Sequence, residues 1–298
     1  MKMMMRGRLR AVILLPLAGL ALAAISAAVP PVAAAARTGL LRNTACPALL
    51  SFSSLPLFAH VTGADDVMVD SSGNVWVSNV SGLQVTELSP TGAVEHTFFD
   101  GGSPEGMVQL SPTTIALASQ TTDRLVVLNT TTGAIQVWVQ LTPNGRTGVD
   151  GLGVEPGTLL LPDSAQGNLD TVPLPPFSGG PTTVATGLGR PTDATPVGDG
   201  TLLVSVENPP GLDRVNPATG SVTAAADLKS TDDVVYRNGI AYVADNGNAT
   251  FSAVTLSTGA VTTLVTGVIE AQGLAMRSDG SFLVVSEATG DIRIATGC

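Results

Sequence analysis

Histidine and cysteine are both scarce in this chain, which has two of each among 298 residues. His60 and His96 stand far apart, and no G-x-S-x-G motif occurs, so the sequence gives no support to Ser-His-Asp catalysis. It also lacks a Walker loop and a Rossmann fingerprint, which argues against those modes of nucleotide binding. Two cysteines without neighbouring His or Cys ligands argue against a zinc site.

Basic residues are few, and four of them stand at the N-terminus: Lys2, Arg6, Arg8 and Arg10. A continuous apolar run, Ala11 to Val29, follows them, and small residues occupy 33–36. This order predicts a secretory signal peptide over residues 1–36. The apolar run is nearly long enough to span a bilayer, so an uncleaved membrane anchor is the alternative. The small-residue end and the prolines within the segment favour cleavage.

The expected mature chain is strongly acidic. It keeps 10 of the 14 basic residues and all 24 acidic residues, which gives a net charge of −14. This balance argues against nucleic acid and anionic membranes as partners and is compatible with cations. We expect a secreted, periplasmic or extracellular protein, monomeric and without stable membrane insertion after cleavage. In an oxidising compartment Cys46 and Cys298 are expected to form a disulfide, with two free thiols as the alternative.

Aromatic residues make up 4% of the chain, so a core must rest on Val, Leu, Ile and Ala. Beyond the N-terminal segment the sequence shows no sustained helical periodicity. It shows short apolar runs, such as Val75–Val77 and Leu202–Val204, between turns rich in Gly, Asn, Asp and Ser. Regularly spaced short strands with turn signals predict an all-β fold.

A repeated opening organises these strands. An acidic or amide residue precedes a short apolar strand six times, with spacings of 39, 45, 43, 40 and 39 residues. The six opening residues are Asp66, Glu105, Asp150, Asp193, Asp233 and Gln272. A period near 40 built from short strands is typical of a propeller blade, so we predict a six-bladed β-propeller.

The two ends of the chain complement each other. The last repeat stops before its outer strand, and residues 57–63 resemble that strand although they precede the first opening. We therefore expect residues 57–298 to form the propeller, closed by an N-terminal strand that completes blade six, after a lead-in over 37–56. A Cys46–Cys298 bond would lock this ring.

The six openings are expected to face one central channel. Like charges this close raise each other's pKa unless a cation compensates them. Oxygen ligands select a hard divalent ion such as Ca²⁺, Mg²⁺ or Mn²⁺. Alternatively, these side chains cap inner-strand amides and hold channel water. The neighbouring acids Asp65, Asp232 and Glu270 are placed to substitute for members of the ring or crowd it.

A second polar set ends the second strands of the repeats. Its members are Asn79, Gln120, Asp163, Glu207, Asp245 and Glu287. They are placed either to form a wider shell around the channel mouth or to cap turns, and we favour the caps.

The openings around Glu105-Gly106 and Asp150-Gly151, and the strand Gly73–Val77, resemble the blade motifs of the SMP-30/gluconolactonase superfamily and of NHL-type propellers. The resemblance spans about residues 57–298. It implies a channel metal, often Ca²⁺, that polarises a lactone carbonyl beside an acidic base. Carried over by position, it implies Asp66, Asp150, Asp193 and Asp233 as metal ligands, with Asp233 also as the base. For a hydrolase we keep Glu105 as the alternative base. The streptogramin-lyase branch has similar blade lengths but uses a channel histidine, for which neither histidine here is placed.

Two functions follow as expectations. The first is a divalent-metal-dependent hydrolase of a small lactone or ester. The second is a non-catalytic exported propeller that binds a protein, glycan or small ligand, which the short blades favour. Fold alone does not choose between them.

Overall fold

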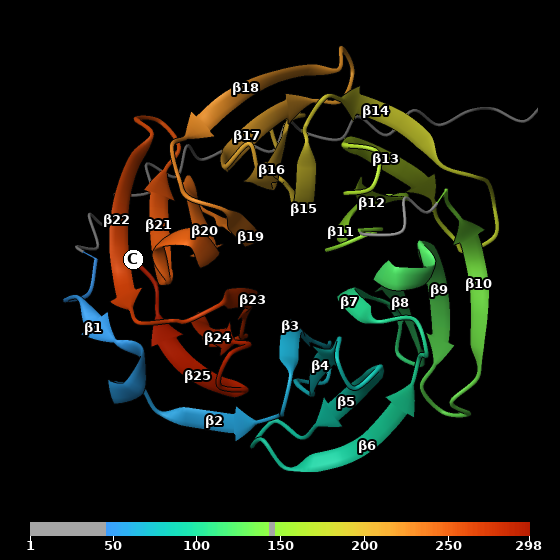
Figure 1. Ribbon diagram of the computed structural model, residues 1–298, viewed down its shortest axis with the longest axis horizontal. Coiled ribbons are helices and arrows are strands. Elements are labelled where there is room, and N and C mark those ends of the chain that lie inside the picture. Colours follow the sequence, from blue (N-terminus) through green and yellow to red (C-terminus); the bar gives the residue numbers. More distant parts are fainter. Residues whose placement is uncertain (1–45, 143–146) are drawn as a thin grey trace, which may run out of the picture. The chain divides into compact units, whose positions relative to one another are not determined.

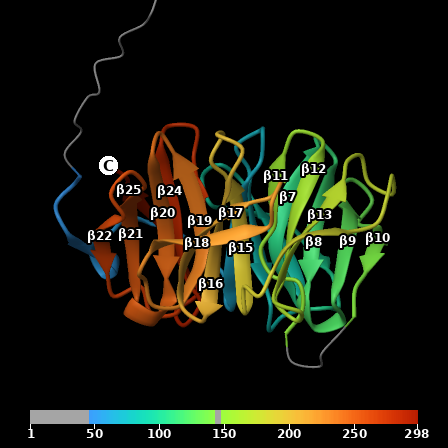
Figure 2. The same cartoon turned by 90° about the horizontal axis from the view of Figure 1, so that it is seen from above.

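Six sheets, antiparallel except for one short added strand, are arranged as blades around a central channel in this computed structural model, which describes residues 46–142 and 147–298 (Figure 1). This confirms the predicted six-bladed β-propeller. Figure 2 shows the ring from the side, with the strands running across its thickness. The predicted signal peptide lies outside the described residues. The described part contains no helix long and apolar enough to cross a membrane.

Each blade runs from an inner strand at the channel to an outer strand at the rim. In blade order, the inner strands are β3 (Ala64–Val69), β7 (Pro104–Ser111), β11 (Gly153–Glu155), β15 (Arg190–Pro196), β19 (Thr231–Arg237) and β23 (Ala271–Met276). The second strands are β4 (Val75–Asn79), β8 (Thr114–Ser119), β12 (Thr158–Asp163), β16 (Leu202–Asn208), β20 (Ile240–Asp245) and β24 (Ser281–Ser286).

The third strands are β5 (Gln84–Leu88), β9 (Arg124–Asn129), β13 (Asn168–Pro173), β17 (Gly211–Asn216), β21 (Thr250–Thr255) and β25 (Asp291–Thr296). The outer strands are β6 (Val94–Phe99), β10 (Ile135–Gln140), β14 (Thr182–Thr186), β18 (Ser221–Ala226), β22 (Ala260–Thr266) and, in blade six, β2 (Leu57–His60). Short 3₁₀ turns occur at η1 (Phe52–Ser54), η2 (Gln120–Thr122) and η3 (Asn246–Asn248).

The hydrophobic core lies between the blades. The described residues form six apolar clusters, each shared by two adjacent blades. Between blades three and four, for example, Leu160, Leu169, Val204 and Val215 are fully buried or nearly so. Because a blade is covered on both faces, its second strand is buried on both sides, as five of the six residues of β12 are. This stacking fixes the inner strands around the channel.

The N-terminal strand closes the ring, as the sequence predicted. β2 pairs antiparallel with β25, with Leu57 opposite Arg293, and so completes blade six. A further short strand, β1 (Leu50–Ser51), pairs in parallel with β22 of blade five. The lead-in therefore contributes strand pairing to a neighbouring blade as well.

The predicted disulfide is present between Cys46 and Cys298 and ties the lead-in to the last residue. The core cluster beside it contains four aromatic side chains among its aliphatic ones: Phe52, Tyr242, Phe251 and Phe282. The Tyr242 and Phe282 rings lie 4.4 Å apart, and the Tyr242 hydroxyl donates a 3.0 Å hydrogen bond to the carbonyl of Cys298. Several of the few aromatic residues of the chain thus lie between blades five and six, beside the disulfide.

Candidate functional site

A β-bulge opens the inner strand of most blades. In blade one Ala64 pairs with Asn79, but the next pair is Val67 with Val77, so two residues lie opposite one. Blades two, five and six repeat this interruption, and blade four has its bulge between Pro191 and Asp193. Bulges re-aim side chains where a strand meets a site. Here each one presents two successive residues at the channel.

Equivalent positions follow from this register. The first bulge position holds Asp65, Glu105, Asp150, Thr192, Asp232 and Gln272. The second position holds Asp66, Gly106, Gly151, Asp193, Asp233 and Gly273. The six openings read from the sequence therefore mix two positions and do not form one ring. In blades one and five two acids are adjacent in the sequence. The predicted openings there are the second acids, Asp66 and Asp233, which lie one residue later than the openings of blades two, three and six.

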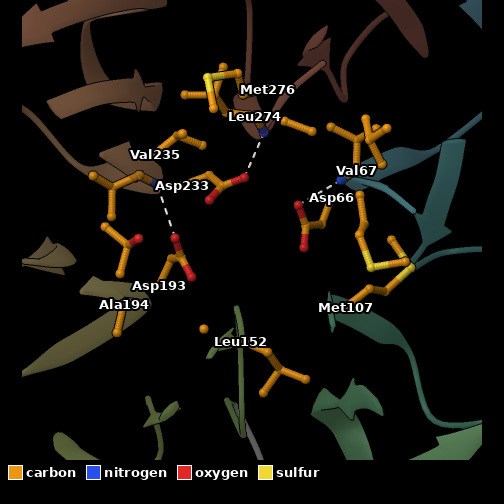
Figure 3. Close-up of a pocket in the computed structure, with 16 residues that line it drawn as sticks. Asp66, Val67, Met107, Leu152, Asp193, Ala194, Asp233, Val235, Leu274 and Met276 are labelled. Atoms are coloured by element: carbon orange, nitrogen blue, oxygen red, sulfur yellow. Dashed lines mark hydrogen bonds between the residues drawn. The ribbon is translucent and has the colours of Figure 1, made fainter. Parts of the chain in front are cut away.

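The three acids at the second position lie together in the channel, and we call Asp66, Asp193 and Asp233 the channel triad (Figure 3). Asp193 accepts a 3.1 Å hydrogen bond from the backbone N–H of Val234, and Asp233 a 2.6 Å bond from that of Leu274. Both donors belong to the next blade. Asp66 accepts a 2.6 Å bond from its own neighbour, Val67. These bonds leave carboxyl oxygens facing the channel.

Burial and mutual repulsion make the channel triad hard to ionise. Burial, and then the charge of Asp193, raise the pKa of Asp66 to about 7. Burial, with the charges of Asp193 and Asp66, raises the pKa of Asp233 well above its usual value. Asp233 is also hydrogen-bonded through its carboxyl to both other members. Three carboxyls in such contact need shared protons or a bound cation.

Glycine is required where the other three blades lack an acid at the second position. A Cβ on Gly106 would lie 2.4 Å from the Cα of Gly151, and one on Gly151 would lie 2.6 Å from the carbonyl oxygen of Thr192. Blades two and three thus approach their neighbours too closely for any side chain there. This is why the triad has members from three blades.

The first-position acids form a separate mouth group, Asp65, Glu105, Asp150 and Asp232. Burial is the main cause that raises the pKa of each, and Asp65 and Glu105 are hydrogen-bonded to each other. The pKa of Asp150 is raised to about 6, a rise that Arg190 limits through its charge and through a 3.4 Å contact with the carboxylate. Arg190 also pairs with Glu207. The mouth group therefore has a cation beside it.

Of the four predicted metal ligands, the structure brings Asp66, Asp193 and Asp233 together, whereas Asp150 lies with the mouth group. The two predicted bases are also separated. Asp233 belongs to the channel triad and lines a cavity, whereas Glu105 belongs to the mouth group.

The second polar set divides into two halves. Asn79, Asp163 and Asp245 cap turns through backbone N–H groups, as expected. The other three reach the mouth: Gln120 donates to Asp150, Glu207 pairs with Arg190, and Glu287 accepts from Gln272. The two halves differ by one residue in the repeat, because Gln120, Glu207 and Glu287 each lie one position later in their blade than the capping residues do in theirs.

Sequence reasoning missed three mouth residues. Ser164 donates hydrogen bonds to Asp150 and to the Pro191 carbonyl, and Asn246 donates to Gln272. Ser164 and Asn246 each directly follow a capping acid, Asp163 or Asp245. They occupy the position of Gln120, Glu207 and Glu287 in the other blades, so aligning the repeats at that position would have identified them. Arg190 has no equivalent signal in the other blades.

A cavity of about 300 Å³ extends from the channel triad along the inner strands (Figure 3). Its lining runs from the triad to Val69, Val235 and Met276, towards the ends of β3, β19 and β23. No mouth-group residue lines it. A ligand in this cavity would meet the triad first.

The histidines lie away from the channel on outer strands. His60 contacts Asp291 at 3.1 Å and His96 contacts Glu87 at 2.9 Å, and each side chain is more than half exposed. Neither histidine therefore has a channel position, as expected from the sequence.

The chain matches no protein-family model and no curated protein sequence. Solved structures with a similar fold include regucalcin from Agrobacterium tumefaciens, described as a calcium-binding protein, with a TM-score of 0.69 and 15% identity over 84% of this chain and 97% of that one. Streptogramin B lyase has a TM-score of 0.60 and 13% identity over 82% and 95%. A nidogen/laminin complex has a TM-score of 0.63 and 19% identity over 71% and 84%. At these identities the likeness shows the fold, a six-bladed propeller shared by enzymes and by a protein complex.

Proposed function

We propose that this is an exported propeller that binds a hard divalent cation, with Ca²⁺ the first choice, at the channel triad and hydrolyses a small ester or lactone beside it. One observation carries the proposal: three carboxyls, of which Asp193 is buried and the other two are partly buried, line the end of one cavity, and Asp233 is hydrogen-bonded to both others. Arg190, the basic residue beside the mouth group, pairs with Asp150 and Glu207. The described Cys46–Cys298 disulfide supports an oxidising compartment.

The triad fits such an ion in the chemistry of its donors, because hard divalent cations take carboxylate oxygens. The oxygens available are those that do not accept backbone N–H groups. Among the described residues, no group of three acidic, His or Cys side chains is already arranged as a metal centre. Coordination therefore requires the carboxyls of the triad to turn towards the ion.

The bound ion would supply Lewis-acid polarisation of the substrate carbonyl. We assign the base to Asp233, because it lines the cavity whereas Glu105 does not. Asp233 accepts a proton from water as that water attacks the carbonyl carbon, and returns it to the leaving oxygen as the acyl C–O bond breaks. Burial and the charges of Asp193 and Asp66 raise its pKa, which favours the protonated form that returns the proton to the leaving oxygen.

A second candidate is a binding propeller without chemistry. The hydrogen bonds that the triad carboxyls accept from backbone N–H groups favour it. Those of Asp193 and Asp233 join neighbouring blades and so give these acids a structural role. In this account the channel holds a small ligand over protonated carboxyls.

Turnover of a panel of lactones and esters, with chelator and then with added Ca²⁺, Mg²⁺ or Mn²⁺, separates the two. We expect cation-dependent hydrolysis that Asp233→Asn abolishes. Asp227→Asn, at an exposed acid outside the channel, is the matched control and should leave turnover unchanged. Hydrolysis that depends on neither the cation nor Asp233 would contradict this proposal. No hydrolysis of any panel member would support the binding propeller instead.

A further inference from the structure

Most of the residues that line the cavity beyond the channel triad have aliphatic or thioether side chains. Met107, Leu152 and Leu274 line the cavity near the triad, and Val235 and Met276 line it further along β19 and β23 (Figure 3). Among the described lining residues, Thr195 and the triad are the ones whose side chains carry strong hydrogen-bonding groups. Apart from Thr195, the side chains that line the cavity beyond the triad are therefore apolar.

This contrast bears on the kind of molecule the cavity accepts. A polyhydroxylated ligand needs a hydrogen-bond partner for each buried hydroxyl, and a group left unpaired lowers affinity. A hydrocarbon chain needs none, and gains from leaving water. Methionine adapts its shape to such chains because it is unbranched and flexible.

We propose that the cavity binds the unbranched aliphatic chain of the substrate, so that the substrate class is alkyl-substituted lactones or short acyl esters. The inference deepens the proposed function, because it places the carbonyl at the triad and the chain along Val235 and Met276. The chain end points to the face on which the inner strands finish. There Arg237 donates from Nη1 to the sulfur of Met276 at 3.5 Å, which marks the rim.

The test is equilibrium binding of γ-lactones of increasing chain length to the full mature protein in excess chelator, measured by calorimetry. Without cation this readout does not depend on turnover, so it survives a failure of the hydrolase proposal. We expect the affinity to rise by roughly fourfold for each added methylene until the chain fills the cavity. Glucono-δ-lactone, which has hydroxyls in place of a chain, should bind more weakly than every alkyl member.

Two variants locate the effect. Met276→Gln combined with Val235→Thr keeps side-chain size but makes two partly exposed lining positions polar, and should lower the affinity for γ-octalactone at least tenfold. Val94→Thr, the same kind of change on exposed β6, should have no effect. Affinity that is independent of chain length, no detectable binding of the longest lactone, or equal binding by the lining variant would overturn the proposal.

Discussion

The carboxylate of Asp233 accepts a 2.6 Å hydrogen bond from the backbone N–H of Leu274, which belongs to the inner strand of the next blade. One side chain thus joins two blades and also faces the two other acids of the channel triad. The same contact therefore serves the fold and the site.

Two substitutions at Asp233 separate these roles. Asn keeps an oxygen for the Leu274 N–H and cannot carry a charge that repels Asp66 and Asp193, so in chelator Asp233→Asn should melt at the same temperature as the wild type or higher. Ala leaves that N–H without its partner and should cost about 1–3 kcal/mol in the free energy of unfolding. Denaturant titration of both variants checks this. Equal destabilisation by Asn and Ala would contradict the hydrogen-bonding role.

The buried acids predict a pH dependence of stability in chelator. An unfolded Asp titrates near pH 4, whereas folded Asp66 has a pKa of about 7 and Asp150 one of about 6. Between about pH 4 and pH 7 the folded state thus binds more protons than the unfolded state. The stabilisation is fully present below pH 4 and is lost as pH rises through 6 to 7.

The melting temperature should therefore fall between pH 5 and pH 8 in chelator. Asp66→Asn combined with Asp233→Asn should flatten this fall, and Asp227→Asn should leave it intact. A melting temperature that rises over the same range would show that these acids are ionised in the folded protein without a cation.

Close approach of the inner strands makes Gly106 a position where one methyl group matters. Gly106→Ala places Cβ against the backbone of Gly151, and should destabilise the protein by about 3 kcal/mol through overpacking. Gly180 has nothing within 4 Å of an added Cβ, so Gly180→Ala is the control and should have little effect. Thermal melts of the two variants compare them. Equal melting temperatures would contradict the tight contact between blades two and three.

Much of this fold was readable from the sequence because it follows from spacing. The period near 40 residues, the missing last strand and the spare strand at 57–63 predicted the blades and their closure. The site was harder to predict, because a bulge shifts the strand register by one residue, and a shift of one residue points a side chain to the other face of the strand. Asp65-Asp66 offers two acids for one position, and only the pairing of Ala64 and Val67 with β4 assigns them. Arg190 was missed because nothing in the repeat marks it.

The Cys46–Cys298 bond should account for a large share of the stability. It spans 252 residues, and the loop-entropy account assigns a bond of this span about 5 kcal/mol, less any strain. Replacing both cysteines by serine should lower the denaturant midpoint accordingly, while β2 keeps its pairing with β25. Reduction of the wild type should reproduce the loss, and reductant should not affect the serine variant. An unchanged midpoint would show that the strand pairing alone closes the ring.

The most direct test of the central claim is the melting temperature of the mature protein at pH 7.5 in chelator and after addition of Ca²⁺, Mg²⁺ or Mn²⁺. An ion that binds the folded state alone adds about 2.7 kcal/mol at a hundredfold excess over its Kd. The account predicts an ion-selective rise that is lost in Asp66→Asn and Asp193→Asn and kept in Asp227→Asn. No rise with any of the three ions, or an equal rise in the triad variants, would contradict a cation at the channel triad.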